Sequence, residues 1–435
     1  MGGYLSVTPE DYQEMINTVG VKDVRELFEC IPQNMILQKL NIPDGLSEFE
    51  VRQAMEKIAS KNKVFSSIFR GAGAYNHYIP SIVKAVVGKE EFLTAYTPYQ
   101  AEISQGVLQA IFEYQTLMCE LTGMDASNAS VYDGAVAAAE GIAMCRERKK
   151  NMAVLSAAIN PEVMEVIKTY CRGNGIEYSI VGSKDGRTDL DALAAQVNEN
   201  TACIYAERPN YFGQLEDIKT MSAIAHSVKA KMIAGCNPVS LGILTTPAEC
   251  DADIAVGEGQ PLGMPLSFGG PYLGFMSCKK EMMRKLPGRI VGETTDQFGN
   301  RAFVLTLQAR EQHIRREKAS SNICSNEALC ALTAAVYLSA MGPDGLEQTA
   351  LQCCSKAHYL AEQLEKTGFT LVYKNEFFHE FVTDCPIDAA ALFAALEKEG
   401  ILGGLLLEDG NILWCATEKN TKKDIDRLVA VIKEI

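Results

Sequence analysis

The sequence lacks a long hydrophobic run, an excess of positive charge and a recognisable secretory leader. No apolar run approaches the roughly 18–20 residues that a membrane-spanning helix needs, so we expect no membrane span. The 435 residues carry 41 Lys and Arg against 55 Asp and Glu, a formal net charge of −14. A chain this acidic is a poor partner for nucleic acid or for an anionic membrane surface. The N-terminal residues show neither the basic nor the apolar segment of a signal peptide, which predicts a cytoplasmic protein.

Recognisable metal-binding patterns are also missing. The 14 cysteines include no CxxC pair, and the five histidines form no HExxH motif. Cysteines within apolar segments are typical of reduced, buried thiols in a reducing compartment. Cys353, Cys354 and His358 lie close together in the sequence, but no second group of ligands follows at a usable spacing. We therefore interpret them as helix-packing residues and expect no metal site.

Two common nucleotide-binding motifs are absent as well. No GxxxxGK(S/T) sequence occurs, which excludes a P-loop. The segment from Gly257 to Gly263 comes closest to a dinucleotide fingerprint, but its spacing is wrong. Pro261 and Pro265 also interrupt the helix whose N-terminus would hold the pyrophosphate. We expect no NAD site.

The first hundred residues predict two helices and then a long loop. A Thr-Pro-Glu sequence at residues 8–10 is typical of a capped helix start and predicts a helix over about 9–19. Ser47 predicts the start of a second helix over about 47–60. Residues 68–105 are rich in Gly, Pro and aromatic side chains. Long ordered loops of this composition often carry functional residues.

From residue 106 onward, helices and short β-rich runs alternate. We predict strands at 152–159, 177–181, 202–207, 231–235, 252–257 and 272–278, and helices at 106–122, 134–149, 161–172, 189–198 and 216–229. This alternation indicates a mostly parallel sheet covered by helices on both faces. After about residue 320, a helix over 325–341, ended by Gly342 and Pro343, leads to a second helix over about 347–367.

These patterns predict an α/β protein in three parts. A helical N-terminal extension (1–65) precedes a large domain with a mostly parallel sheet (66–320), and a small α+β domain (321–435) ends the chain. Trp414 lies in the strand-like sequence ILWCAT and is expected in the core. The outline is that of the fold-type I enzymes that use pyridoxal phosphate (PLP).

Six segments carry a more specific signal. They are YTPYQAEISQG (96–106), SVYDGAVAAAEG (130–141), ERPNYFGQLEDI (207–218), NPVSLGIL (237–244), DADIAVGEGQPLGMPLSFGGPYLGF (251–275) and REQHIRREKASSNICSNEAL (310–329). In this order they resemble the glycine cleavage system P-protein family, the decarboxylating glycine dehydrogenases, and in particular the α subunit of its two-subunit bacterial form. The resemblance runs nearly end to end. It implies a fold-type I PLP-dependent transferase fold.

The resemblance also implies an activity and a set of partners. Together with a β subunit, in an α2β2 assembly, the chain would decarboxylate glycine and release CO2. PLP would be bound on the β subunit, and the aminomethyl group would pass to the lipoyl group of H-protein. No NAD is required, because lipoamide is the oxidant.

The residues themselves argue against a cofactor on this chain. PLP catalysis needs a lysine for the Schiff base and a carboxylate beside the pyridine nitrogen. By alignment with the family, Pro261 occupies the expected lysine position, and no lysine occurs between Lys231 and Lys279. The expected carboxylate is replaced by Ala234 and Gly235. We therefore predict no catalytic residue on this chain alone.

Asp133 adds a third argument at the expected phosphate site. It precedes the predicted helix over 134–149, and its carboxylate is well placed to cap that helix. A cap of this kind would take the backbone N–H groups that a phosphate needs and would repel a dianion. The sequence therefore predicts a vacant cofactor pocket.

Fold-type I dimers build their active sites at subunit interfaces, so this chain can still contribute residues to its partner. The candidate donors have hydroxyl, amide or charged side chains: Tyr96, Thr97, Tyr99, Gln100, Ser104, Gln105, Glu258, Ser267, Tyr272 and Arg310. Tyrosine hydroxyls and amides can hydrogen-bond a carboxylate or a phosphate. We call residues 96–105 the aromatic loop. The alternative is that this loop only packs in a dimer interface and does not contact the active site.

Arg310 belongs to the densest positive cluster of the chain, with Arg315, Arg316 and Lys318. This cluster could meet a partner's carboxylates, the glycine carboxylate or an acidic H-protein. The alternative is a solvated helix face on which the neighbouring glutamates balance the positive charges.

Two other functions remain open at this point. The chain could be a scaffolding or regulatory pseudo-enzyme that never touches substrate. It could also be a self-sufficient PLP enzyme, such as an aminotransferase or a desulfurase, that uses a lysine elsewhere. The lysine-free span 232–278 argues against the second.

Overall fold

The structure, a computed structural model, describes residues 6–37, 39–268, 270–323 and 326–435. Contacts within the chain define two compact units, Met1–Val64 and Phe65–Ile435. The helical extension over residues 1–65 stays a prediction as a domain. The two units are described separately below.

The first unit contains the two helices that the sequence predicts. Helix α1 (Pro9–Val19) begins at a capping box in which Thr8 and Asp11 exchange hydrogen bonds, and it ends at Gly20 with φ +82°. Helix α2 (Glu48–Ala59) begins at a second capping box, from Ser47. Both starts follow directly from local sequence.

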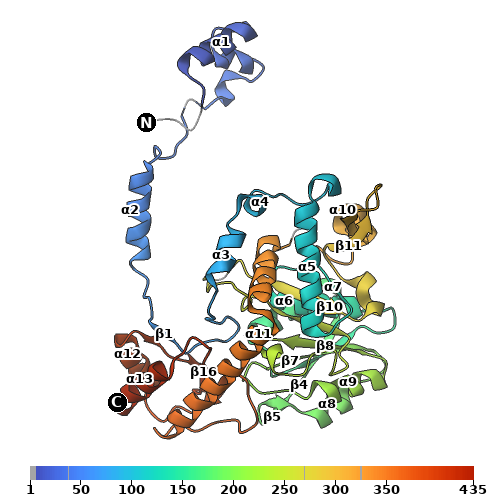
Figure 1. The fold of residues 1–435 in the computed structure, drawn as a ribbon, viewed down its shortest axis with the longest axis vertical. Helices are drawn as coiled ribbons and strands as arrows, with labels where there is room; N and C mark the ends of the chain where they lie inside the picture. Colours follow the sequence, from blue (N-terminus) through green and yellow to red (C-terminus); the bar gives the residue numbers. More distant parts are fainter. Residues whose placement is uncertain (1–5, 38, 269, 324–325) are drawn as a thin grey trace. The chain divides into compact units, whose positions relative to one another are not determined.

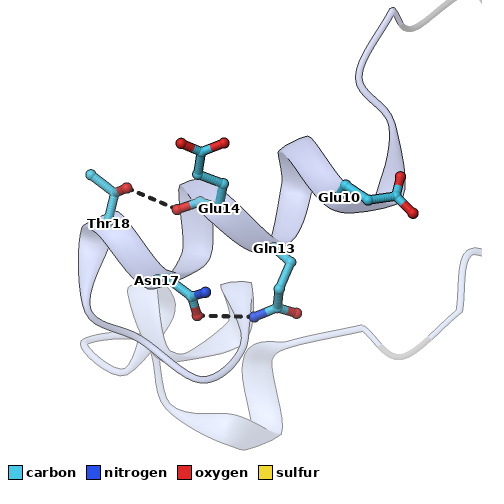
Figure 2. Close-up of a pocket in the computed structure, with 5 residues that line it drawn as sticks. All are labelled: Glu10, Gln13, Glu14, Asn17 and Thr18. Atoms are coloured by element: carbon cyan, nitrogen blue, oxygen red, sulfur yellow. Dashed lines mark hydrogen bonds between the residues drawn. The ribbon is translucent and has the colours of Figure 1, made fainter.

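Side chains of the first unit are mostly exposed. Ile16 is its only buried residue among those that the structure describes. Figure 2 shows a shallow pocket on α1 that is lined by polar side chains: Glu10, Gln13, Glu14, Asn17 and Thr18. The side-chain amide of Gln13 donates to Asn17 at 3.1 Å, and the Thr18 hydroxyl donates to the Glu14 carbonyl at 2.8 Å. These contacts are one turn apart and describe an ordinary solvated helix face.

The second unit is built on a seven-stranded sheet in the order β2-β10-β9-β8-β7-β3-β4. Its strands are β2 (Ala126–Ser127), β3 (Met152–Ser156), β4 (Glu177–Val181), β7 (Thr201–Arg208), β8 (Lys231–Cys236), β9 (Ile254–Glu258) and β10 (Gly274–Cys278). Strand β10 runs antiparallel to both of its neighbours, and the other pairings are parallel. The prediction of a mostly parallel sheet is confirmed.

Helices cover both faces of this sheet (Figure 1). They are α5 (Gln105–Thr122), α6 (Gly134–Cys145), α7 (Pro161–Asn174), α8 (Leu190–Gln196) and α9 (Ile218–Ser227). Along β3, Leu155 packs in the core with α6 and α7, whereas Val154 packs in the core with α8 and α9. Successive strand residues point to opposite faces, so apolar strands with little alternation are what two covered faces require. Helix α6 ends before the predicted residue 149, because the backbone leaves the helix at Arg146.

Smaller elements surround the sheet. They are β1 (Ser67–Ile68), α3 (Ser81–Val87), α4 (Glu90–Leu93), β5 (Ser183–Lys184), β6 (Arg187–Thr188), the hairpin β11 (Ile290–Thr295) and β12 (Arg301–Thr306), and α10 (Gln312–Arg315). The hairpin packs against α5, where Phe303 is buried with Leu108 and Ile111.

Helix α11 (Ala328–Glu365) links the sheet to the C-terminal elements. It breaks at Gly342 (φ +63°, ψ −178°), followed by Pro343, which confirms the predicted boundary between two helices. Tyr337, before the break, and Leu360, after it, are buried in two different cores. By length and composition α11 is apolar enough to cross a membrane, although the sequence predicted no such segment. The break and the two cores are those of a packed interior helix.

The C-terminal elements surround Trp414, which is fully buried as predicted. They are β13 (Glu380–Thr383), α12 (Ala389–Lys398), β14 (Ile401–Leu402), β15 (Leu405–Leu406), β16 (Ile412–Cys415) and α13 (Lys422–Lys433). The Trp414 indole donates to the Thr383 hydroxyl at 3.0 Å. Strand β1 pairs with β14, so the segment after residue 65 joins the last elements of the chain. This pairing and α11 tie residues 65–435 into one compact unit, and a boundary near residue 320 stays a prediction.

Candidate functional site

A cavity of about 450 Å³ lies where parallel strands end, at the position of cofactors in α/β sheets. Residues at the ends of β7, β8 and β9 line it, together with the N-terminus of α6, the loop at residues 71–75, and Tyr272 and Glu380. We call it the sheet-edge cavity. The structure thus brings together three residues that the sequence analysis singled out: Asp133, Glu258 and Tyr272.

Two carboxylates occupy the N-terminus of α6 inside this cavity. Asp133 accepts a hydrogen bond from the Val136 N–H at 2.7 Å, which confirms its predicted role as a helix cap. Glu258 accepts from the Gly134 N–H at 3.0 Å and also from the N–H groups of Gln260 and Leu273 at 2.9 and 3.0 Å. Two of the N–H groups at this helix N-terminus, those of Gly134 and Val136, are therefore already bonded to carboxylates and not free for a phosphate. The role of Glu258 was not foreseen.

Gln260 and Pro261, which alignment with the family predicts at the lysine position, belong to a folded segment without an amine. Pro261 and Gln260 are both buried. The Gln260 side chain exchanges hydrogen bonds with the backbone of Tyr75 at 2.8 and 2.9 Å, and its amide also donates to the Met264 carbonyl at 2.8 Å. The described residues that line the cavity include no lysine. A Schiff base has no partner here.

The structure adds a carboxylate that sequence reasoning missed. Glu207, at the end of β7, lies beside Gly235 so closely that a Cβ on Gly235 would come within 2.8 Å of its Cγ. Its oxygens accept from the Tyr205 hydroxyl and the Asn160 N–H, each at 2.9 Å. The resemblance to the family predicts the carboxylate on the strand that ends at Gly235, whereas Glu207 comes from the neighbouring strand. Its one sequence signal was its place in the ERPNYF segment.

Glu380 is a second acid that was missed. It is buried and accepts hydrogen bonds from the Ala72 N–H at 2.6 Å and from the Tyr75 hydroxyl at 2.8 Å. Burial raises the pKa of each of Glu207, Glu258 and Glu380 to about 7, against the lowering effect of their hydrogen bonds. The described lining of this cavity contains several acids and no lysine, and the Gly134 and Val136 N–H groups are already bonded to carboxylates, so it does not fit PLP.

A second cavity, of about 360 Å³, lies beneath the aromatic loop and is lined by residues of α5, the start of α11 and Arg289. We call it the loop cavity. Tyr96 and Thr97 line it, and Tyr96 is 84% exposed. Tyr99 lies next to it, with its hydroxyl 3.4 Å from Nη2 of Arg289. The guanidinium carbon of Arg289 is 5.4 Å from the centre of the Tyr99 ring.

Three other predicted donors of the aromatic segment do not line either cavity. Gln105 braces the structure: its amide donates to the Phe303 carbonyl at 2.9 Å and accepts from the Phe303 N–H at 2.8 Å. Ser104 precedes α5 without a side-chain capping bond, and Gln100 is exposed. Of the glycine-rich turn, Ser267 donates its N–H to the Tyr272 hydroxyl at 3.4 Å.

Arg310 lies apart from both cavities. It lines a depression of about 300 Å³ with other cationic side chains, namely Arg146, Arg284, Lys285, Arg315 and Lys318. Its guanidinium donates to the backbone carbonyls of Leu286 and, at 2.7 Å, Gly288. Arg310 therefore braces the turn before β11.

One group of potential metal ligands occurs among the described residues, and it differs from the one considered in the sequence. His77, Cys353 and Glu418 place their ligand atoms within 4.8 Å of one another. Nδ1 of His77 lies 2.7 Å from the Glu418 carboxylate, and the Cys353 thiol donates to that carboxylate at 3.3 Å. The group is a hydrogen-bonded junction between α11 and the end of the chain.

Comparison with other proteins agrees with the geometry. Residues 3–432 match the family described as glycine cleavage system P-protein. A relative from Moorella thermoacetica, named probable glycine dehydrogenase (decarboxylating) subunit 1, is 48% identical, and the alignment covers 99% of each chain. A crystal structure of glycine decarboxylase (P-protein) of the glycine cleavage system, in inhibitor-bound form, is 40% identical with a TM-score of 0.93, and the match covers 100% of each chain.

A more distant structure bears on the fold alone. It is a C-DES variant with glycine covalently linked to the PLP cofactor, 14% identical with a TM-score of 0.62, and the match covers 91% of this chain and 100% of that one. The fold is the fold-type I arrangement of PLP-dependent enzymes, as predicted. From its sequence and its structure together, this chain belongs to the glycine cleavage system P-protein family.

Proposed function

We propose that the chain is the α subunit of a two-subunit glycine decarboxylase. In the reaction that this assigns, glycine loses its carboxylate as CO2 and its aminomethyl group passes to the lipoyl group of H-protein. The lipoyl disulfide accepts the electrons, so the step requires no NAD. Family membership supports the reaction, and the name of the Moorella relative, subunit 1, supports a partner subunit.

The observation that carries this proposal is that the chain's own side chains fill the cofactor positions of the sheet-edge cavity. Alignment with the family puts Pro261 at the expected lysine position. Asp133 and Glu258 accept from the Val136 and Gly134 N–H groups, where a phosphate would bind. A family member with such a cavity needs its cofactor elsewhere. We therefore assign both the Schiff-base lysine and PLP to a β subunit.

This chain would then contribute through its aromatic loop. Tyr96 is 84% exposed and Tyr99 is 55% exposed, and both present a hydroxyl that can hydrogen-bond a carboxylate or phosphate. Gln100 is exposed beside them. Large aromatic side chains so exposed in the isolated chain are typical of a surface that a partner covers. Gln105 and Arg310 are engaged within the chain, and we assign them no contact with substrate.

The assembly and its setting complete the proposal. We expect an α2β2 complex in the cytoplasm, with glycine and lipoylated H-protein as its substrates. The acidic net charge of −14 supports this setting. Neither nucleic acid nor a membrane is expected to take part.

Borohydride trapping tests where the cofactor is bound. The chain alone and the chain with its β subunit are each incubated with PLP, reduced, and mapped by mass spectrometry. We expect no specific adduct on the chain alone and a stoichiometric adduct on one lysine of the β subunit in the mixture. A stoichiometric adduct on one lysine of this chain would instead make it a self-sufficient PLP enzyme.

A second measurement separates a contributing subunit from a scaffold. Tyr96→Phe and Gln100→Ala are compared with wild type for assembly and for turnover of the complex. We expect turnover to fall while assembly persists. Unchanged turnover in both variants would favour the scaffolding role.

A further inference from the structure

Arg289 is a buried charge without an ion pair. Its side chain lies just before β11 and is 4% exposed, and no carboxylate of the described chain comes within 4.0 Å of it. Its Nε has no hydrogen-bond partner, and its one side-chain hydrogen bond is the long contact with Tyr99 at 3.4 Å. Glu311 acts on it only at longer range. Buried guanidinium groups normally have a carboxylate or several carbonyls around them.

The loop cavity contains further polar groups without partners. The Tyr114 hydroxyl, on a side chain that is 1% exposed, and Nδ2 of Asn326 have no hydrogen-bond partner. Both residues line the cavity with Arg289. Burial raises the pKa of Tyr114, so its hydroxyl remains a neutral donor. Three residues with unpartnered donors line this one cavity, which favours an acceptor with negative charge there.

The cavity also contains one acid, which does not supply that acceptor. Glu327 lines it, but forms no ion pair with Arg289 within 4.0 Å. Burial raises the pKa of Glu327. A carboxyl group whose charge is disfavoured is a weak counter-charge for a guanidinium.

The rim of the loop cavity is apolar and exposed. Leu93, Tyr96 and Leu329 line it with 56%, 84% and 45% of their surface accessible. A small acid from solution would neutralise Arg289 but would leave this rim in water. A protein segment with a carboxylate among apolar side chains would cover both, as in the core of a typical interface.

We propose that the loop cavity receives an Asp or Glu side chain from an apolar segment of the partner subunit, and that its carboxylate pairs with Arg289. The inference rests on the proposed function only for the existence of that subunit. Arg289 is then an assembly residue, and it has no ion pair within the described chain because its carboxylate partner arrives with the other subunit. Tyr114 and Asn326 would donate to the same carboxylate.

Arg289→Gln tests this through two measurements: the unfolding temperature of the isolated chain, which should not fall, and the affinity for the β subunit, which should fall. The variant removes an unpaired buried charge, so the isolated chain should unfold at the same temperature as wild type or a higher one. In the complex, the variant leaves the partner's carboxylate unpaired, and the Kd for the β subunit should rise roughly 30-fold or more. Arg301→Gln is the matched control, since Arg301 is exposed on the adjacent strand and pairs with Glu293 at 2.8 Å. It should change neither readout.

The opposite results would overturn the inference. A lower unfolding temperature with an unchanged Kd would make Arg289 a purely structural residue. A loss of affinity seen only with PLP-loaded partner would identify the anion as the cofactor phosphate. Saturable stabilisation of the isolated chain by acetate or octanoate, in competition with the β subunit, would identify a small acid instead.

One measurement needs no variant and holds even if Arg289→Gln does not fold. Hydrogen exchange of the wild-type chain should slow in peptides covering residues 92–98 and 326–332 when the β subunit binds. Unchanged exchange there, in a complex that forms, would overturn the inference alone. If the wild-type chains do not associate at all, the proposed function fails with it.

Discussion

The two cavities of the second unit differ in how their polar groups are satisfied. In the sheet-edge cavity, the carboxylates of Glu207, Glu258 and Glu380 each accept at least two hydrogen bonds from the chain itself. In the loop cavity, Tyr114 and Arg289 have donors without acceptors. The carboxylates of the sheet-edge cavity are stabilised by hydrogen bonds within the chain. The unpaired donors of the loop cavity are available to bind a group from another molecule.

The paired groups of the sheet-edge cavity also lie where the family resemblance leads us to expect a cofactor. Replacing a lysine alone would leave an empty pocket with free helix N–H groups. Here Gln260, Asp133 and Glu258 have taken over those positions. We therefore expect that a lysine introduced at residue 261 would not by itself create a PLP site.

The largest effect is expected from adding a methyl group beside Asp133, which lines the sheet-edge cavity. A Cβ on Gly274 would lie 2.2 Å from the Asp133 carbonyl oxygen, which is backbone and cannot move aside cheaply. Gly274→Ala should cost about 3 kcal/mol or more of unfolding free energy. Chemical denaturation of the isolated chain measures it.

Gly173→Ala is the matched control for that substitution. Gly173 lies inside α7, and no atom comes within 4 Å of the position of an added Cβ. An alanine there should stabilise the chain by about 0.5–1 kcal/mol, since alanine is the better helix former. Equal effects at the two glycines would mean that the contact between β10 and α6 is loose.

The next largest effect is a dependence of the unfolding free energy on pH, which comes from the buried acids of the sheet-edge cavity. The folded pKa of Glu207 is about 7, raised by burial from an ordinary value of 4.5. The folded chain therefore binds more protons than the unfolded chain between these values, and stability falls as pH rises from about 4.5 to 7. For one such group the loss is on the order of 3 kcal/mol.

Glu207→Gln should flatten this slope. An amide does not titrate; its oxygen can accept from the Asn160 N–H while its NH2 group donates to the Tyr205 hydroxyl. The substitution also removes a charge that adds to the effect of burial in raising the pKa of Glu380. Urea unfolding at several pH values between 5 and 8 would measure the change, with the exposed Glu408→Gln as control. A slope that stays as steep as wild type would show that other groups cause it.

The sequence predicted features that depend on neighbouring residues. The starts of α1, α2 and α6 were foreseen because a cap and its N–H lie within three residues of one another. The break at Gly342 and Pro343 was equally local. The sheet followed from apolar runs at regular spacing. For such elements, tertiary packing agrees with local preference.

What the sequence could not show depends on distance in space. Glu258 reaches the N-terminus of α6 from 124 residues away, and Glu207 lies beside Gly235 only because β7 and β8 pair. The isolation of Arg289 is the absence of a counter-charge, which no pattern in one chain can reveal. Arg310 was singled out because it lies in a basic run, but its guanidinium binds nearby carbonyls.

Each cavity is lined by one buried tyrosine, and the two tyrosines differ in their hydrogen bonding. Tyr205 is 2% exposed and donates its hydroxyl to Glu207, whereas Tyr114 is 1% exposed and donates to no acceptor. Tyr205→Phe should cost about 1–3 kcal/mol, because it removes a hydrogen bond from a buried carboxylate. Tyr114→Phe should leave the isolated chain within about 0.5 kcal/mol of wild type or stabilise it. A large loss in Tyr114→Phe would place an unseen acceptor in the loop cavity.

The smallest effect concerns the cap of α6. Asp133 accepts from the Val136 N–H at 2.7 Å, so Asp133→Ala should cost about 1 kcal/mol. Asp133→Asn should cost only a few tenths, since asparagine caps helices about as well as aspartate. Urea denaturation resolves the two. If removal of the Asp133 charge in the Asn variant allowed a soluble pyridoxal analogue with a phosphate to bind, Asp133 alone would close the site. We expect no binding, because Glu258 still accepts from the Gly134 N–H, and this result would show that the cavity is closed by more than one residue.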